Sequence, residues 1–136
     1  MKVFLDTNVW LSATVFPGLC DEILQQCAVR GWLYSCKLVR RDAHAVLQRK
    51  FAQLPQSCGL FDAVLQAALL SEDVEQPATD NDARLVAAAR AAGMEVFVTG
   101  DKRVLRWNPP QGRLHALRIE SPRQAWQTLF GLTAGK

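Results

Sequence analysis

The stretch Lys2-Val3-Phe4-Leu5-Asp6-Thr7-Asn8 opens the chain with a short apolar run that ends in a carboxylate. A continuous apolar run of this length is typical of a strand buried on both faces, as in a parallel sheet covered by helices. Asp6 would then follow the carboxyl end of a central strand, where open α/β sheets bind their ligands. The alternative is a turn aspartate whose side chain accepts a hydrogen bond from the backbone two residues on.

Length and composition place the chain among ordinary globular proteins. Its 136 residues predict a single domain, residues 1–136, with a core that needs no disulfide or metal to hold it. The contents of 49% hydrophobic and 21% charged residues exclude a disordered chain. No apolar run approaches the ~20 residues of a membrane-spanning helix, and Asp6 interrupts any signal-peptide core, so we expect a cytoplasmic protein. The net charge of +3 permits nucleic-acid binding without establishing it.

The cysteines and histidines form no recognisable catalytic or metal-binding pattern. The four cysteines include no C-x-x-C pair, which disfavours a zinc site and favours cysteines buried as small hydrophobic residues. The two histidines, His44 and His115, lie beside no obvious nucleophile in the sequence. A Ser-His-Asp or Cys-His catalyst is therefore disfavoured.

Short apolar segments alternate with amphipathic ones along the chain. Beyond the first strand we expect strands at 32–35, 94–98 and 114–119 and helices at 9–16, 19–30, 38–51, 58–70 and 79–92. An irregular connection is expected at 72–77, with room for a short strand around Val74. Ser121-Pro122-Arg123-Gln124 starts a last helix, because it combines an S-x-x-Q capping box with proline at the first helical position. The alternation predicts a three-layer α/β fold with a mainly parallel central sheet flanked by helices.

Two aspartates follow expected strands of this sheet. Asp6 ends the first strand, and Asp101 follows the strand at 94–98 after Thr99-Gly100. If both strands are central and parallel, their carboxyl ends open on the same edge of the sheet.

A third aspartate, Asp82, lies in the first turn of the expected helix 79–92. Its spacing from Leu85 places it on the packed face, and helical side chains lean toward the N-terminus, so it would reach the same edge of the sheet. Thr79-x-x-Asp82 also fits a capping box, and an acid there is favoured by the helix dipole. Function and capping both remain open for Asp82.

A fourth aspartate, Asp42, borders the apolar stripe of the expected helix 38–51. A solvated carboxylate has no reason to lie there, and an unpaired buried carboxylate is strongly destabilising. The structural alternative is an ion pair with a neighbouring arginine, Arg40, Arg41 or Arg49.

Four carboxylates directed at one point would repel one another unless a cation were present. Ligands that are all oxygen select a hard ion, Mg²⁺ or Mn²⁺, and zinc lacks its usual histidine and cysteine ligands. Such a site binds a phosphate oxygen, acidifies a water and stabilises a leaving oxygen. The four aspartates therefore predict phosphodiester hydrolysis.

These motifs together resemble the PIN-domain ribonucleases, in particular the small single-domain proteins related to VapC-type toxins of bacterial toxin–antitoxin pairs. Segment 3–9 resembles the family's opening strand with its first acid, and segment 82–89 is similar to its D-x-x-[IL]-x-A helix. Segment 98–102 resembles its T-x-D signature, and segment 119–122 is similar to the [ST]-P start of its last helix. Each piece is short, but their order and spacing together are specific.

The resemblance implies a PIN-like fold and a ribonuclease whose Mg²⁺ or Mn²⁺ is held by Asp6, Asp42, Asp82 and Asp101. It also implies that Asn8 and Thr99 orient these acids or their bound waters. The family's second acid is usually glutamate, and the shorter Asp42 at the matching place leaves two possibilities open, a direct bond to the metal or contact through water.

The resemblance further implies an RNA substrate, a homodimer and, for a toxin, a cognate antitoxin that holds the nuclease inactive. The cations nearest to the acidic edge in sequence are the expected RNA contacts, Lys102, Arg103 and Arg106. A solvated charged turn explains these cations equally well.

Two other hypotheses remain. A PIN-like fold without catalysis would be an RNA- or protein-binding module, and the aspartate at position 42 favours it. A receiver-like signalling domain would use Asp101-Lys102 as its acid and lysine. A receiver needs an acidic pair after the first strand and a phosphoacceptor at the end of a mid-chain strand, whereas Asp6-Thr7-Asn8 supplies one acid.

Overall fold

The computed structural model describes residues 1–15, 18–53, 56–71, 81–107 and 117–131 and contains one parallel sheet. Five strands form this sheet in the order β3-β2-β1-β4-β5, and all four neighbouring pairs are parallel. The strands are β1 (Val3–Leu5), β2 (Leu33–Cys36), β3 (Leu69–Ser71), β4 (Val96–Val98) and β5 (Arg118–Glu120). Because every pair is parallel, the carboxyl ends of all five strands lie at one edge.

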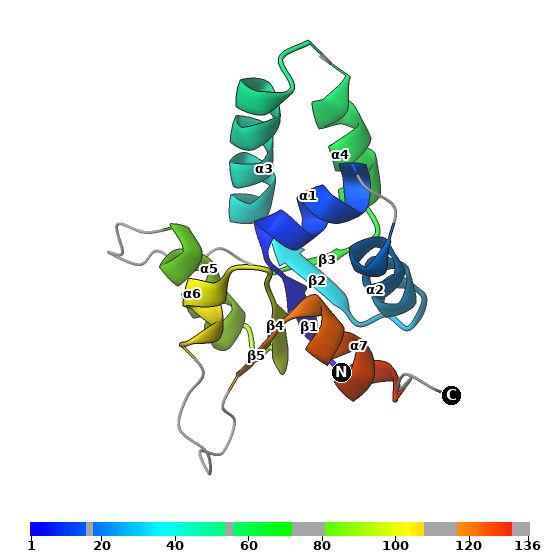
Figure 1. The fold of residues 1–136 in the computed structure, drawn as a ribbon, viewed down its shortest axis with the longest axis vertical. Helices are drawn as coiled ribbons and strands as arrows, with labels where there is room; N and C mark the ends of the chain where they lie inside the picture. The colour runs from blue at the N-terminus through cyan, green and yellow to red at the C-terminus, as the bar shows by residue number, and fades with distance from the viewer. Residues whose placement is uncertain (16–17, 54–55, 72–80, 108–116, 132–136) are drawn as a thin grey trace.

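Helices cover both faces of the sheet (Figure 1). They are α1 (Thr7–Val15), α2 (Leu19–Val29), α3 (Lys37–Lys50), α4 (Ser57–Leu65), α5 (Asn81–Ala91), α6 (Lys102–Leu105) and α7 (Pro122–Phe130). Helices α2 and α7 pack together on one side of the sheet, and α5 and α6 lie on the other. Helices α3 and α4 stand as a pair beyond the carboxyl edge, with α1 packed against both at their base. The expected α/β class with a parallel sheet is confirmed.

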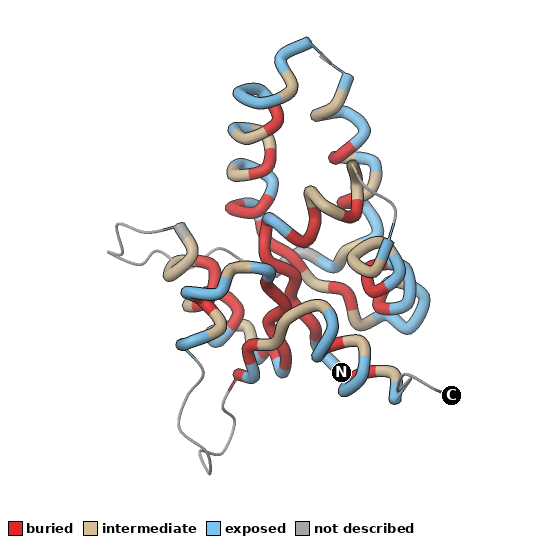
Figure 2. Tube along the Cα trace, viewed as in Figure 1, coloured by how far each residue is buried: buried red, intermediate tan, exposed pale blue. Residues whose placement is uncertain are grey.

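The core runs through the two central strands, which Figure 2 shows as buried along their length. All three residues of β1 and all three of β4 have no exposed surface. Phe4 stacks on Phe97 across these strands with ring centroids 5.6 Å apart. Trp10 of α1 meets Phe61 of α4 edge to face and so ties the α3–α4 pair to the sheet. Burial on both faces fixes the β1–β4 register, and with it the residues that follow each strand.

One expected helix is shorter in the structure and is followed by a strand. The helix expected at 58–70 ends at Leu65, and the strand β3 follows it as the edge strand beside β2. Pairing of Leu69 with Tyr34 and of Ser71 with Cys36 decides this conformation, and those partners are distant in sequence. Local periodicity carries no information about such pairing. The strand expected around Val74 lies outside the described residues.

The helix ends are better predicted by the sequence. Ser121 and Gln124 form both hydrogen bonds of the expected capping box at the start of α7. The short helix α6 was not predicted, and Asp101 caps it by accepting a hydrogen bond from the Arg103 backbone N–H. Residue Thr79, the expected cap of α5, lies outside the described part.

Among the described residues, no helix is long and apolar enough to cross a membrane.

Candidate active site

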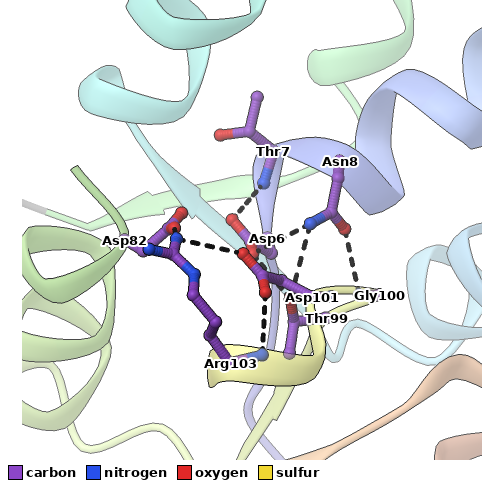
Figure 3. A network of polar contacts seen from close by, with 8 residues as sticks. All are labelled: Asp6, Thr7, Asn8, Asp82, Thr99, Gly100, Asp101 and Arg103. Atoms are coloured by element: carbon purple, nitrogen blue, oxygen red, sulfur yellow. Dashed lines mark hydrogen bonds and ion pairs between the residues drawn. The ribbon is translucent and has the colours of Figure 1, made fainter. Parts of the chain in front are cut away.

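The carboxyl edge of the sheet collects polar residues from three segments: the one after β1, the connection from β4 to α6, and the start of α5. Asp6 follows β1, Thr99 follows β4, Asp101 precedes α6, and Asp82 lies in the first turn of α5 (Figure 3). The pairing of Leu5 with Val98 places the residues after the two central strands side by side.

The Asp6 carboxylate is buried and held by three hydrogen bonds. It is 1% exposed. Its Oδ1 accepts from the Thr7 backbone N–H at 2.7 Å, and its Oδ2 accepts from Thr99 Oγ1 at 2.7 Å and from Asn8 Nδ2 at 3.2 Å. The Asn8 amide is itself held, because its Oδ1 accepts from the Gly100 backbone N–H at 3.1 Å. Asn8 and Thr99, which the motif resemblance assigned to orienting the acids, both donate to Asp6.

Burial makes the charged form of Asp6 costly. Burial first, and then the negative charges of Asp82 and Asp101, raise the pKa of this carboxyl to about 6. The hydrogen bonds from Thr99 and from the Thr7 backbone oppose the rise in pKa only in part. A cation placed among these carboxylates would relieve the cost.

Asp82 and Asp101 share one positive side chain. Arg103 Nη2 lies 2.8 Å from Asp82 Oδ2 and 3.3 Å from Asp101 Oδ2. Asp101 also accepts from the Arg103 backbone N–H at 2.9 Å. That backbone bond, together with the guanidinium, lowers the pKa of Asp101.

Asp42 faces the same site from α3. It lines a hollow of about 400 Å³ together with Asp6 and Asp82. Burial raises the pKa of Asp42, the charge of Asp82 raises it further, and Arg84 and Arg41 oppose this rise. Among the arginines considered as its ion-pair partner, Arg40 instead forms a salt bridge with Asp62 at 3.0 Å.

The chemistry of this donor set fits a hard divalent cation. Besides the carboxylates, the hollow is lined by Thr7, whose buried Oγ1 has no hydrogen-bond partner among the described residues. An unpaired buried hydroxyl is destabilising, and a hydrated cation beside it would offer a partner. In the described part of the chain, no three acidic, histidine or cysteine side chains are yet arranged to hold one ion. The side chains would therefore have to turn to complete a metal site.

The sequence analysis named Arg49 only as a possible ion-pair partner of Asp42 and did not expect cations in this hollow. Arg49 and Lys50, at the end of α3, line it together with the carboxylates. Their spacing of seven and eight residues from Asp42 places all three on one face of α3, and this was the signal in the sequence. Of the three cations expected to contact RNA, Arg103 pairs with two of the acids, and Lys102 and Arg106 are exposed on α6 and at its C-cap.

Known proteins give the chain no family assignment. No protein-family model matches it, and no curated protein matches its sequence significantly. The chemistry of the site is therefore inferred from its own side chains and from the motifs that carry the PIN resemblance.

Proposed function

We propose that the chain is a metal-dependent ribonuclease with a PIN-like fold, which hydrolyses RNA phosphodiester bonds. The observation that carries the proposal is the gathering of acids from four separate segments at the carboxyl edge of the sheet. Asp6 is buried there beside the negative charges of Asp82 and Asp101, which raise its pKa. Asp42 lines the same hollow as Asp6 and Asp82. Stability alone gives no reason to gather like charges, and functional sites commonly carry such a cost.

The chain's residues have distinct parts in the proposed reaction. Asp6, Asp82 and Asp101 would hold Mg²⁺ or Mn²⁺, with Asp42 directly or through water. The cation would supply an acidified water and polarise the phosphoryl oxygen. Thr99 and Asn8 hold the Asp6 carboxylate in one orientation through their hydrogen bonds. Arg49 and Lys50 would attract the RNA backbone to the hollow by charge.

The test is cleavage of single-stranded RNA by the purified protein with Mg²⁺ or Mn²⁺, with EDTA, and with the Asp82→Asn variant as the control for contaminating nucleases. We expect metal-dependent products with a 5′-phosphate and a 3′-hydroxyl, and no cleavage by the variant. Undiminished cleavage in excess chelator would refute the mechanism. RNA binding without cleavage in either metal would favour the binding-module hypothesis instead.

The strand order favours this proposal over the receiver-like hypothesis. Receiver domains have the doubly wound order 2-1-3-4-5, whereas the described strands here run β3-β2-β1-β4-β5. A single acid also follows β1, because Asp6 is succeeded by Thr7 and Asn8.

We propose the toxin role, the homodimer and the antitoxin on the motif resemblance alone. The gene context tests the toxin role. We expect a short neighbouring gene that encodes a DNA-binding protein, and this protein should suppress the ribonuclease when it is added. Mass measurement in solution tests the dimer. A protein that is not toxic on expression and has no such neighbour would be a ribonuclease outside the toxin–antitoxin pairs.

A further inference from the structure

Arg103 connects two elements of the site that are far apart in sequence. It belongs to α6, two residues after Asp101, and its guanidinium crosses to Asp82 at the start of α5 (Figure 3). A single nitrogen, Nη2, lies 2.8 Å from Asp82 Oδ2 and 3.3 Å from Asp101 Oδ2. One positive group therefore holds an oxygen of each of two acids.

These two oxygens are the ones that a cation between α5 and α6 would use. A divalent ion and a guanidinium are both positive, so they repel each other, and each disfavours the other at the same two carboxylate oxygens. The Arg103 side chain is 64% exposed. It can therefore swing into solvent while its backbone N–H keeps the hydrogen bond to Asp101. Leaving the acids does not require the helix to unfold.

We propose that Arg103 is an internal counter-cation that competes with the divalent metal for Asp82 and Asp101. Metal binding requires its guanidinium to leave these carboxylates, so Arg103 lowers the affinity of the site for metal. The inference rests on the proposed function for the identity of the ligand. It adds that the chain carries its own competitor, and that this competitor sets the metal concentration at which the site fills.

The experiment is calorimetric titration of Mn²⁺ into the parent, Arg103→Ala and Arg106→Ala, without RNA. Arg106, the C-cap of the same helix, is the matched control because its loss removes the same charge from α6. Exposed ion pairs are individually weak, so we expect Arg103→Ala to bind Mn²⁺ about three- to tenfold more tightly than the parent. Arg106→Ala should change the affinity by less than about twofold, since charges in solvent are screened over a short distance.

The possible outcomes separate the inference from the function on which it rests. If Arg103→Ala binds no more tightly than Arg106→Ala, the competition is refuted and the metal site stands. If no variant binds Mn²⁺, both the inference and the metal-dependent function fail. Arg103→Gln, which keeps the length of the side chain without its charge, repeats the test if the alanine variant does not fold. In the parent, the Arg103 side-chain N–H resonance should also shift during a Mg²⁺ titration, and a resonance that stays in place would refute the displacement.

Discussion

The acidic cluster has two halves that differ in how their negative charge is balanced. In the buried half, Asp6 and Asp42 have raised pKa values, and burial is the first cause for each. In the bridged half, Arg103 joins Asp82 to Asp101, and the pKa of Asp101 is lowered. Asp6 and Asp101 both come shortly after neighbouring parallel strands, so residue type and topology do not decide the sign of the shift.

The surroundings of each carboxylate decide whether its pKa is raised or lowered. Asp6 is 1% exposed and lies at the top of the core, where loss of hydration outweighs its three hydrogen bonds. Asp101 keeps 28% of its side chain exposed and receives a backbone N–H at the start of α6. The buried half therefore stores a cost that a cation would relieve, and the bridged half already holds a cation.

The largest effect that we expect is on RNA cleavage. Loss of an aspartate from either half of the acidic cluster should lower it to a similar extent. Asp6→Asn and Asp101→Asn should each lower metal-dependent RNA cleavage by at least about a hundredfold, because each removes a charged ligand of the ion that stabilises the transition state. Initial cleavage rates at saturating Mn²⁺ measure this. Asp21→Asn on α2 is the matched control and should cleave as the parent does. Full activity in either site variant would remove that aspartate from the metal site.

The next largest effect is on the pH dependence of stability. The buried half and the bridged half should change the free energy of unfolding in opposite directions as the pH rises. Between about pH 4 and pH 6, folded Asp6 keeps a proton that the unfolded chain releases, so stability falls as the pH rises through this window. A shift of about two pKa units corresponds to roughly 3 kcal/mol as an upper figure. The lowered pKa of Asp101 acts the other way, because its stabilisation is present above the unfolded pKa and is lost as the pH falls through the folded one.

Urea unfolding in EDTA at pH 4.5 and pH 7.5, conditions that bracket most of the Asp6 window, measures this difference. The loss of stability on raising the pH should be smaller in Asp6→Asn than in the parent, since the variant has no carboxyl at this position. An unchanged pH dependence in Asp6→Asn would show that another group is responsible.

RNA binding should distinguish the cations beside the two halves. Replacing both Arg49 and Lys50 by alanine should weaken binding roughly tenfold and reduce the slope of log K against log salt by about 1.4, if each meets one phosphate. The matched pair is Lys102 with Arg106 on the α6 side, replaced in the same way. Fluorescence anisotropy in EDTA, where cleavage does not interfere, gives both quantities. A larger effect from the α6 pair would place the RNA path over the bridged half, as the sequence predicted.

The smallest effect is on stability at neutral pH in EDTA. Asp42→Asn should stabilise the fold by about 0.5–1 kcal/mol, because it removes a partly buried charge that Asp82 repels. Asp101→Ala should destabilise it by about 1 kcal/mol, because α6 loses its N-cap. Asp101→Asn is the control, since asparagine caps as well as aspartate does. Thermal melts compare the three, and stabilisation by Asp101→Ala would contradict the assignment of the two halves.

Much of the fold could be predicted from the sequence because its signals are local. The two central strands are continuous apolar runs, and the α7 capping box lies within four consecutive residues. The edge strand β3 and the short helix α6 were not predicted. The strand β3 depends on pairing with β2, whose residues are distant in sequence, and the helix α6 has only four residues, too few to show a helical period.

By itself, the sequence predicted that Asp6 and Asp101 would lie at one edge of a parallel sheet, because each comes shortly after an apolar run that is typical of a buried strand. Only the tertiary structure decided which carboxylates are balanced by a positive charge. Arg103 meets Asp82 across 21 residues of chain, and Arg49 and Lys50 of α3 line the same hollow as the carboxylates. The sign of a pKa shift depends on burial and on distances through space, which neither residue type nor spacing along the chain specifies.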